Sequence, residues 1–159
     1  MKFTVVSVGK VKEPYLAAGV KDFLTRLRPY VNVEFIEGME QKTPPDPTAA
    51  QIADVVEKEG QRVLSILKEG DYLVCLDSRG NSMTSEALAA LVQNLVNSGR
   101  SRAIFVVGGS HGLSPQLLRQ ADLTLSFSPL TFPHQLAVLM LLEQLYRSFK
   151  IIKCEPYHK

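Results

Sequence analysis

The stretch IFVVGGSHGLSPQLLRQADLTLSFSPLTFPH, residues 104–134, decides the expected fold. It opens with four apolar residues that end at the glycine-rich sequence GGSHG, residues 108–112. A second strand-like run, residues 123–127, ends in a loop marked by Pro129 and Pro133. Strands that end in irregular loops are typical of the carboxyl edge of an open α/β sheet, where ligands bind. The stretch therefore predicts both a fold class and a first candidate site.

Outward from this stretch, strand-like and helical patterns alternate along the chain. Apolar, β-branched runs predict three earlier strands and one at the start of the stretch, at residues 3–8, 31–36, 71–76 and 103–107. Amphipathic periodicity and capping residues predict helices at residues 14–28, 48–68, 84–98, 114–120 and 133–152. This alternation predicts an α/β fold, with a mainly parallel sheet covered by helices on both faces.

Several local features refine this expectation. Residues 31–36 alternate apolar with polar positions, which favours an edge strand, and the proline-rich residues 38–47 predict a loop. Glu59 falls on the apolar stripe of its helix and indicates a polar contact there, while Gly60 beside it predicts close packing or a bend. The last helix is apolar nearly all round at its start, so its own domain or a partner chain is expected to bury it.

Composition excludes several classes of protein. The 159 residues, 45% hydrophobic and 21% charged, predict one globular domain spanning residues 1–159. A net charge of +2 argues against nonspecific polyanion binding, although a local basic patch stays open. Cys75 lies in an apolar run, where a buried thiol is expected, and no cysteine spacing is typical of disulfides or metals. The longest apolar run is far shorter than the roughly 20 residues that span a bilayer, so a cytoplasmic protein without membrane contact is expected.

The glycine-rich loop fits none of the common nucleotide or catalytic motifs. It lacks the first glycine and the later acidic residue of a dinucleotide fingerprint, and it has no Walker lysine. Ser110 does not stand in a nucleophile elbow. His111, His134 and His158 have no ligand spacing, so no metal site is expected. A plain tight turn is the alternative for this loop, His134 is expected to be structural or pocket-lining, and His111 receives no role.

The carboxyl-terminal tail, residues 146–159 (YRSFKIIKCEPYHK), carries more information. It contains four cationic residues and one glutamate, which gives a local net charge of +3. The cations are interleaved with Tyr146, Phe149, Tyr157 and His158. Cations can meet phosphates while flat rings stack on exposed bases, which is how looped RNA is held. The alternative is a helix end whose cations complement the helix dipole, followed by an unstructured terminus.

Several of these motifs, in this order and spacing, resemble the RlmH (YbeA-like) family of SPOUT-class RNA methyltransferases. The resemblance covers essentially the full chain and rests on VGK near the start, KEGQR (residues 58–62), GGSHG, SFSPLTFPHQ (residues 126–135), EQLYR (residues 143–147) and the terminal PYHK. It implies a C-terminal trefoil knot over roughly residues 73–159, which ordinary topology rules would not propose. It also implies a homodimer with the active site at the subunit interface.

The reaction implied by the resemblance is methyl transfer from S-adenosylmethionine to N3 of a pseudouridine in large-subunit (23S) ribosomal RNA. The family's cofactor positions carry over as Leu76, Gly108, Phe127, Ser128, Pro129, Leu130, Thr131 and Phe132. Removal of the imide proton and stabilisation of the resulting anion point to Arg147, Tyr157 and His158 as catalytic candidates, with a recognition contact as the alternative for His158. Because the chain is small and weakly basic, we expect it to read the assembled 70S ribosome.

Two other classes of function compete with this interpretation. One is a non-catalytic ribosome-binding or assembly factor that kept the knot. The other is a small α/β enzyme that uses a different nucleotide, which the missing fingerprints disfavour.

Overall fold

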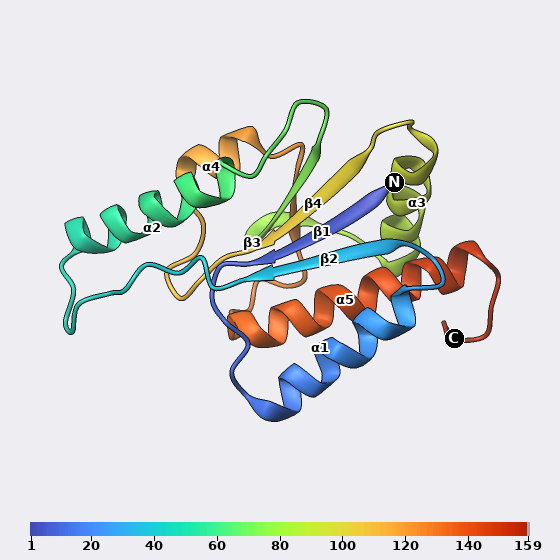
Figure 1. Cartoon of the computed structure of the whole chain (residues 1–159), viewed down its shortest axis with the longest axis horizontal. Coiled ribbons are helices and arrows are strands. Elements are labelled where there is room, and N and C mark those ends of the chain that lie inside the picture. Colours follow the sequence, from blue (N-terminus) through green and yellow to red (C-terminus); the bar gives the residue numbers. More distant parts are fainter. Residues whose placement is uncertain (159) are drawn as a thin grey trace.

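The sheet has five strands, all parallel, in the order β2-β1-β4-β3-β5 (Figure 1). The structure is a computed structural model and describes residues 1–158. The elements follow in chain order as β1 (Lys2–Ser7), α1 (Pro14–Leu27), β2 (Asn32–Glu37), α2 (Ala49–Leu64), β3 (Tyr72–Ser82), α3 (Ser85–Asn97), β4 (Arg102–Val107), α4 (Pro115–Gln120), β5 (Leu123–Ser126) and α5 (His134–Ile152). The expected α/β fold and the edge position of β2 are confirmed.

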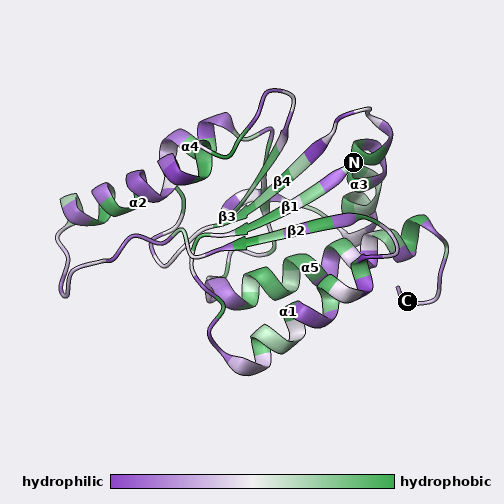
Figure 2. Ribbon diagram, in the orientation of Figure 1, coloured by the Kyte–Doolittle hydropathy of each residue, from purple (hydrophilic) through white to green (hydrophobic). Residues whose placement is uncertain are grey.

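Helices cover both faces of this sheet, as the alternating pattern predicted. Helices α1, α3 and α5 pack together on one face, and α2 and α4 pack on the other (Figure 1). Successive residues of β4 divide between the two cores, with Phe105 in the first and Ile104 in the second. The central strands are therefore apolar on both sides, which explains their unbroken hydrophobic runs (Figure 2).

The helix starts follow from local chemistry. The Thr48 side chain caps α2 by accepting a hydrogen bond from the Gln51 backbone amide, and the Gln51 side chain accepts one from the Thr48 backbone amide. Thr84 caps α3 by accepting a single hydrogen bond from the Ala87 amide. Within α2, a Cβ on Gly60 would lie 2.1 Å from Ser114 Oγ, so the expected close packing is confirmed. Helix α2 ends at Leu64, earlier than the predicted Lys68, because residues 66 and 67 switch to tighter i→i−3 bonds.

Strand β3 is longer than the sequence predicted. We expected it to end at Leu76, followed by a turn at residues 77–81, but it continues to Ser82. Strand β5 pairs with Val74–Leu76 and again with Asn81 and Ser82, while residues 77–80 bulge outward between the two pairings. A Cβ on Gly80 would lie 2.7 Å from the carbonyl oxygen of Thr124, so the bulge lies directly against β5. The turn-rich sequence was interpreted correctly as irregular but wrongly as the end of the strand.

Candidate functional site

A cavity of about 610 Å³, here the strand-end pocket, opens at the carboxyl ends of β3, β4 and β5. Its walls come from the bulge of β3, the turn after β4, the loop between β5 and α5, and the first turn of α5. Seven of the eight residues that the family resemblance assigns to the cofactor line it, and Pro129 does not. These seven are Leu76, Gly108, Phe127, Ser128, Leu130, Thr131 and Phe132.

The loop between β5 and α5 forms one side of the strand-end pocket. The Ser126 hydroxyl lies 3.0 Å from the carbonyl oxygen of Ser78 and 3.2 Å from that of Ser128, which ties this loop to the bulge of β3. The Leu130 amide donates to Ser128 Oγ over 3.0 Å, and the Leu130 side chain is 69% exposed. The loop therefore offers both backbone polar groups and an apolar surface to a ligand.

The glycine-rich turn after β4 forms the facing wall. Gly109 and Gly112 form a one-pair bridge, and Gly112 has a φ of +83°, a conformation that favours glycine. A Cβ on Gly108 would lie 2.9 Å from the Gly112 carbonyl oxygen. The close approach at Gly108 is thus first of all an approach to its own turn, in agreement with the tight-turn interpretation.

Sequence reasoning missed Asp77 in this pocket. Its carboxylate accepts two hydrogen bonds of 3.0 Å from the Arg79 guanidinium, and these hold the pKa of Asp77 below its usual value. The side chain is 12% exposed, so a charged oxygen pair stands at the pocket wall. The only signal in the sequence was a turn-forming DSRG segment, which does not distinguish a pocket residue from a turn residue.

His134 lines the strand-end pocket from the first turn of α5 and fits its predicted structural or pocket-lining role. Its Nε2 lies 3.2 Å from the Lys10 carbonyl oxygen, and a Cβ on Gly9 would lie 2.5 Å from the same nitrogen. The side-chain Oε1 of the neighbouring Gln135 accepts hydrogen bonds from the backbone amides of Lys12 and Glu13. The start of α5 is thereby joined to the loop after β1.

The three catalytic candidates come together in a second place, which we call the tail cluster: Arg147, Tyr157 and His158 with Glu143 and Glu86. Arg147 Nε donates to Glu143 Oε1 over 3.0 Å, and the Tyr157 hydroxyl donates to the same oxygen over 3.0 Å. His158 places Nδ1 3.3 Å from Arg147 and Nε2 2.8 Å from Glu86 Oε1. The sequence predicted the first three residues but neither carboxylate, because Glu143 and Glu86 read as ordinary helix-surface residues.

The charges of the tail cluster stabilise one another. The hydrogen bond to Glu143 raises the pKa of Arg147, while burial and then the same carboxylate raise the pKa of Tyr157. The pKa of Glu86 is lowered to about 2 by its own backbone amide and then by His158. The arrangement leaves Arg147 as a firmly held cation beside an aromatic ring, which suits contact with a phosphate or a flat base.

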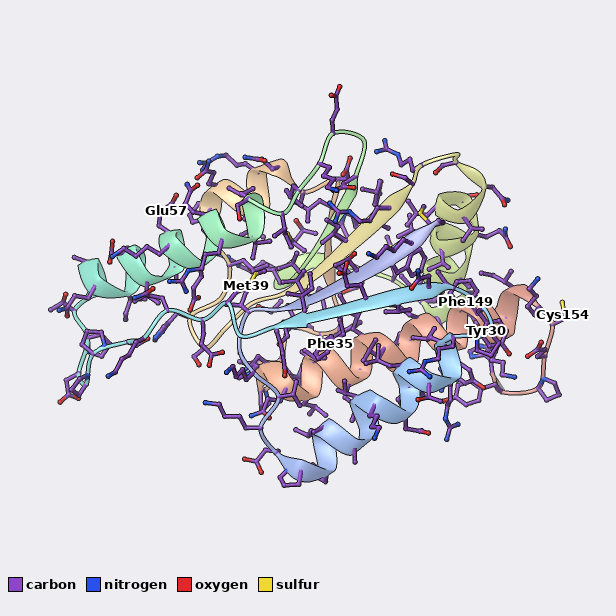
Figure 3. All side chains as sticks on the ribbon, viewed as in Figure 1. Tyr30, Phe35, Met39, Glu57, Phe149 and Cys154 are labelled. Carbon is purple, nitrogen blue, oxygen red and sulfur yellow. The ribbon has the colours of Figure 1, made fainter. Side chains whose placement is uncertain are left out.

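The chain after α5 is fixed rather than loose up to His158. Cys154 adopts a φ of +53°, and Glu155 then accepts hydrogen bonds from Lys150 over 2.6 Å and from the Tyr30 hydroxyl over 2.5 Å. Tyr30 in turn stacks on Phe149 with ring centroids 5.6 Å apart, and both residues are labelled in Figure 3. The alternative of an unstructured terminus is therefore wrong for residues 153–158.

The strand-end pocket and the tail cluster lie at opposite ends of α5. His134 lines the pocket, and Arg147 stands thirteen residues later on the same helix. At 1.5 Å per residue, their backbones are on the order of 20 Å apart. Within one copy of the chain, the two sets of residues therefore lie far from each other.

Three further features concern Cys75, metal binding and membrane spans. Cys75 is buried, as expected, and burial raises the pKa of its thiol to about 12. Within residues 1–158 no three acidic, cysteine or histidine side chains gather in a metal-binding geometry. None of the helices in that same range is long and apolar enough to cross a membrane.

Comparison with known proteins gives consistent results. Residues 1–158 match the family described as "Predicted SPOUT methyltransferase". Proteins named "Ribosomal RNA large subunit methyltransferase H" from Halothermothrix orenii and Acetivibrio thermocellus are 51% and 47% identical over 159 residues, which is 100% of each chain.

A solved structure titled "The structure of a probable methylase family protein from Haemophilus influenzae Rd KW20" superimposes with a TM-score of 0.53 at 10% identity. The match covers 99% of this chain and 70% of that one, so it supports the fold alone. The family match over residues 1–158 and the full-length relatives together show that the chain belongs to the SPOUT methyltransferase family.

Proposed function

We propose that this chain transfers the methyl group of S-adenosylmethionine to N3 of a pseudouridine in large-subunit (23S) ribosomal RNA, within the assembled ribosome in the cytoplasm. The observation that carries the proposal is the strand-end pocket, whose walls include seven of the eight expected cofactor positions. The names of the full-length relatives support the RNA class. The proposal includes a single domain, residues 1–159, threaded as a trefoil knot from about residue 73.

The strand-end pocket has the size and chemistry for this cofactor. Its volume of about 610 Å³ falls within the 300–1,000 Å³ typical of small-molecule sites. Leu76, Leu125 and Phe127 offer apolar contact to an adenine ring, and the Asp77 carboxylate can accept hydrogen bonds from ribose hydroxyls. When bound, the cofactor supplies an electrophilic methyl group on a sulfonium. The chain's own part is to orient that group and to exclude water around it.

The tail cluster suits the RNA side of the reaction. Arg147 can pair with a phosphate or with the anion that forms on the target base, and Tyr157 can stack on a base. Because the two sites are on the order of 20 Å apart in one copy, we assign the complete active site to a homodimer in which the tail of one copy reaches the strand-end pocket of the other.

An apolar surface next to the strand-end pocket supports this dimer. Leu136, Leu139 and Met140 on the first turns of α5 are only half-buried, and Leu130 in the loop before α5 is 69% exposed. Apolar side chains gathered at the start of one helix favour association with a second apolar surface. The same face of a second copy would bury them.

The test is the mass and position of modified nucleosides in 23S rRNA from cells with and without this protein. Loss of one N3-methylpseudouridine, restored by the purified chain and S-adenosylmethionine on 70S particles, is the expected result. An unchanged nucleoside profile, or no cofactor binding by calorimetry, would favour the non-catalytic ribosome-binding alternative. Equal rates on free rRNA and on 70S particles would contradict the ribosome requirement.

A further inference from the structure

A second cavity, here the polar pocket, adjoins the strand-end pocket. It has a volume of about 260 Å³ and shares Gly109, Ser110 and His134 with its larger neighbour. Its volume lies just below the range for whole small-molecule ligands, which suits a fragment such as one flat ring. The other lining residues are mostly polar or charged: Gly9, Lys10, Lys12, Glu40, Gln41, Thr43, Glu59, His111 and Gln135.

Glu59 is the unusual member of this lining. It lies on α2 and is 6% exposed, and its Oε1 accepts the Gln41 amide over 2.8 Å. Between residues 1 and 158, no donor is hydrogen-bonded to Oε2. In that part of the chain, every fully buried side-chain oxygen has a hydrogen-bond partner. Because Oε2 has none, it is not fully buried, and it has access to the cavity that Glu59 lines. The buried Glu59 side chain thus presents one carboxylate oxygen without a hydrogen-bond donor to the polar pocket.

The absence of a side chain at Gly109 keeps Oε2 facing the shared wall. A Cβ built on Gly109 would lie 3.4 Å from Glu59 Oε2 and 3.7 Å from Oε1, which is ordinary contact. A methyl group would fit there, but it would cover the carboxylate where the two pockets meet. Gly109 lines both pockets and therefore adds no side chain between Glu59 and the strand-end pocket.

The surroundings of Glu59 favour its neutral form. Burial raises the pKa of its carboxyl, and Glu40 adds to this, while the Gln41 amide, His111 and Arg62 oppose it. Around the same cavity stand the side chains of Lys10 and Lys12 after β1 and of His134 on α5. A carboxylate whose proton affinity is increased in this way is a better proton acceptor near neutral pH than an exposed one.

From these contacts we infer that the polar pocket receives the target base and that Glu59 Oε2 accepts the proton of its N3–H group. The inference rests on the proposed function and adds the residue that removes the proton. A base in the polar pocket would meet the methyl donor across the shared wall of Gly109, Ser110 and His134. Glu59 and the strand-end pocket belong to the same copy of the chain, so this contact needs no partner subunit.

The proton and electrons of this step balance. The N3–H bond breaks and the proton forms a bond to Glu59 Oε2, which becomes a neutral carboxylic acid. The nitrogen electron pair forms the new N–CH₃ bond, and the electrons of the broken S–CH₃ bond stay on the donor's sulfur. Glu59 later returns its proton to water through the polar pocket. His158 then keeps a recognition role beside Arg147.

Two other roles would also use a buried carboxylate here. Glu59 could hold the ammonium of the cofactor's amino-acid end, or it could only fasten the loop at Gln41. The substitution Glu59→Gln separates the three roles, because the glutamine carbonyl still accepts the Gln41 amide but takes up no proton. Glu57→Gln is the matched control, since Glu57 lies on the outer side of the same helix and is exposed (Figure 3).

The experiment measures single-turnover methylation of unmodified 70S ribosomes from mildly acidic to alkaline pH, together with cofactor affinity by calorimetry. For E59Q we expect a rate about 100-fold lower near neutral pH and a cofactor affinity within about twofold of wild type, since no cofactor contact is lost. The deficit should shrink at alkaline pH, where the imide ionises without help. E57Q should match the wild type, and Gly109→Ala should slow the reaction while the protein stays folded.

Each other result overturns the inference. A wild-type rate in E59Q would mean that Glu59 only anchors the loop at Gln41. Weakened cofactor binding would mean that Glu59 binds the cofactor's ammonium group. A deficit that does not change with pH would also exclude proton transfer to Glu59. If the wild-type chain forms no N3-methylpseudouridine, the proposed function fails together with this inference, whereas an active wild type with an unaffected E59Q overturns the inference alone.

Discussion

Arg147 lies over the ring of Tyr157, with its Cζ atom 4.7 Å from the ring centroid. The same Glu143 oxygen accepts hydrogen bonds from both side chains, so their relative position is fixed by one carboxylate. His158 adds a contact to Arg147 and is held on its other side by Glu86. The tail therefore presents a cation, a ring and an imidazole as one rigid group.

This rigid group leads to a prediction for the tail. Arg147→Ala or His158→Ala should lower methylation of 70S ribosomes, by about 100-fold for Arg147, because a positioned charge is lost from the reaction. Cofactor affinity should stay within about twofold, since neither residue lines the strand-end pocket of its own copy and both are assigned to the RNA side of the site. Rates and calorimetry measure the two quantities. Lys153→Ala, which removes an exposed tail cation, is the control, and loss of cofactor binding in either variant would contradict the assignment.

A mixing experiment tests the shared active site. Arg147→Ala removes a tail residue, and Thr131→Trp fills the strand-end pocket from an exposed loop position. Each variant alone should be nearly inactive. After random reassociation, half of the dimers contain both variants, and one of their two sites is intact. We therefore expect roughly a quarter of the wild-type activity if sites are built across a C₂ interface. No recovery after verified exchange would place each active site within one copy.

Gly80→Ala tests the contact between the bulge of β3 and β5. The new methyl group would lie 2.7 Å from the backbone oxygen of Thr124, which cannot move without disturbing β5. We expect a loss of stability of roughly 1–3 kcal/mol, typical of overpacking. Cofactor affinity should also fall, because Asp77 and Ser78 of the bulge line the strand-end pocket. Thermal unfolding and calorimetry measure both, with Asn81→Ala at an exposed neighbouring position as the control. Unchanged values would mean that the bulge is free to shift.

The raised pKa of the Glu59 carboxyl makes the stability of the fold depend on pH. Burial raises its pKa in the folded chain, so the folded state binds more protons than the unfolded state between the two pKa values. The contribution of Glu59 is therefore most favourable below the unfolded pKa and is lost as pH rises through the folded pKa. At neutral pH, Glu59→Gln should raise the free energy of unfolding by about 1 kcal/mol, or the melting temperature by about 2–4 °C. Glu57→Gln should not, and a melting temperature of E59Q that falls at neutral pH would contradict this account.

The sequence predicted the regular elements well because each is specified locally. Thr84 caps its helix as the sequence indicated, and the apolar runs of β1 and β4 became central strands. The length of β3 was wrong, because its second half is held only by pairing with β5, some forty residues later in the chain. The proposed cofactor residues came from the family resemblance, and periodicity or spacing would not have found them.

What the sequence by itself determined is the α/β class, the two-sided core and the position of a candidate ligand site in residues 104–134, since these depend on periodicity and on turn residues. Its stripe position marked Glu59 as an exception but could not say what the carboxylate faces. Only the tertiary structure decided that Asp77 reaches the pocket, that Glu143 and Glu86 hold the tail, and that Glu59 lies behind Gly109. Each of these relationships joins residues from different elements, and the distance between them depends on how helices and strands pack, which no local pattern encodes.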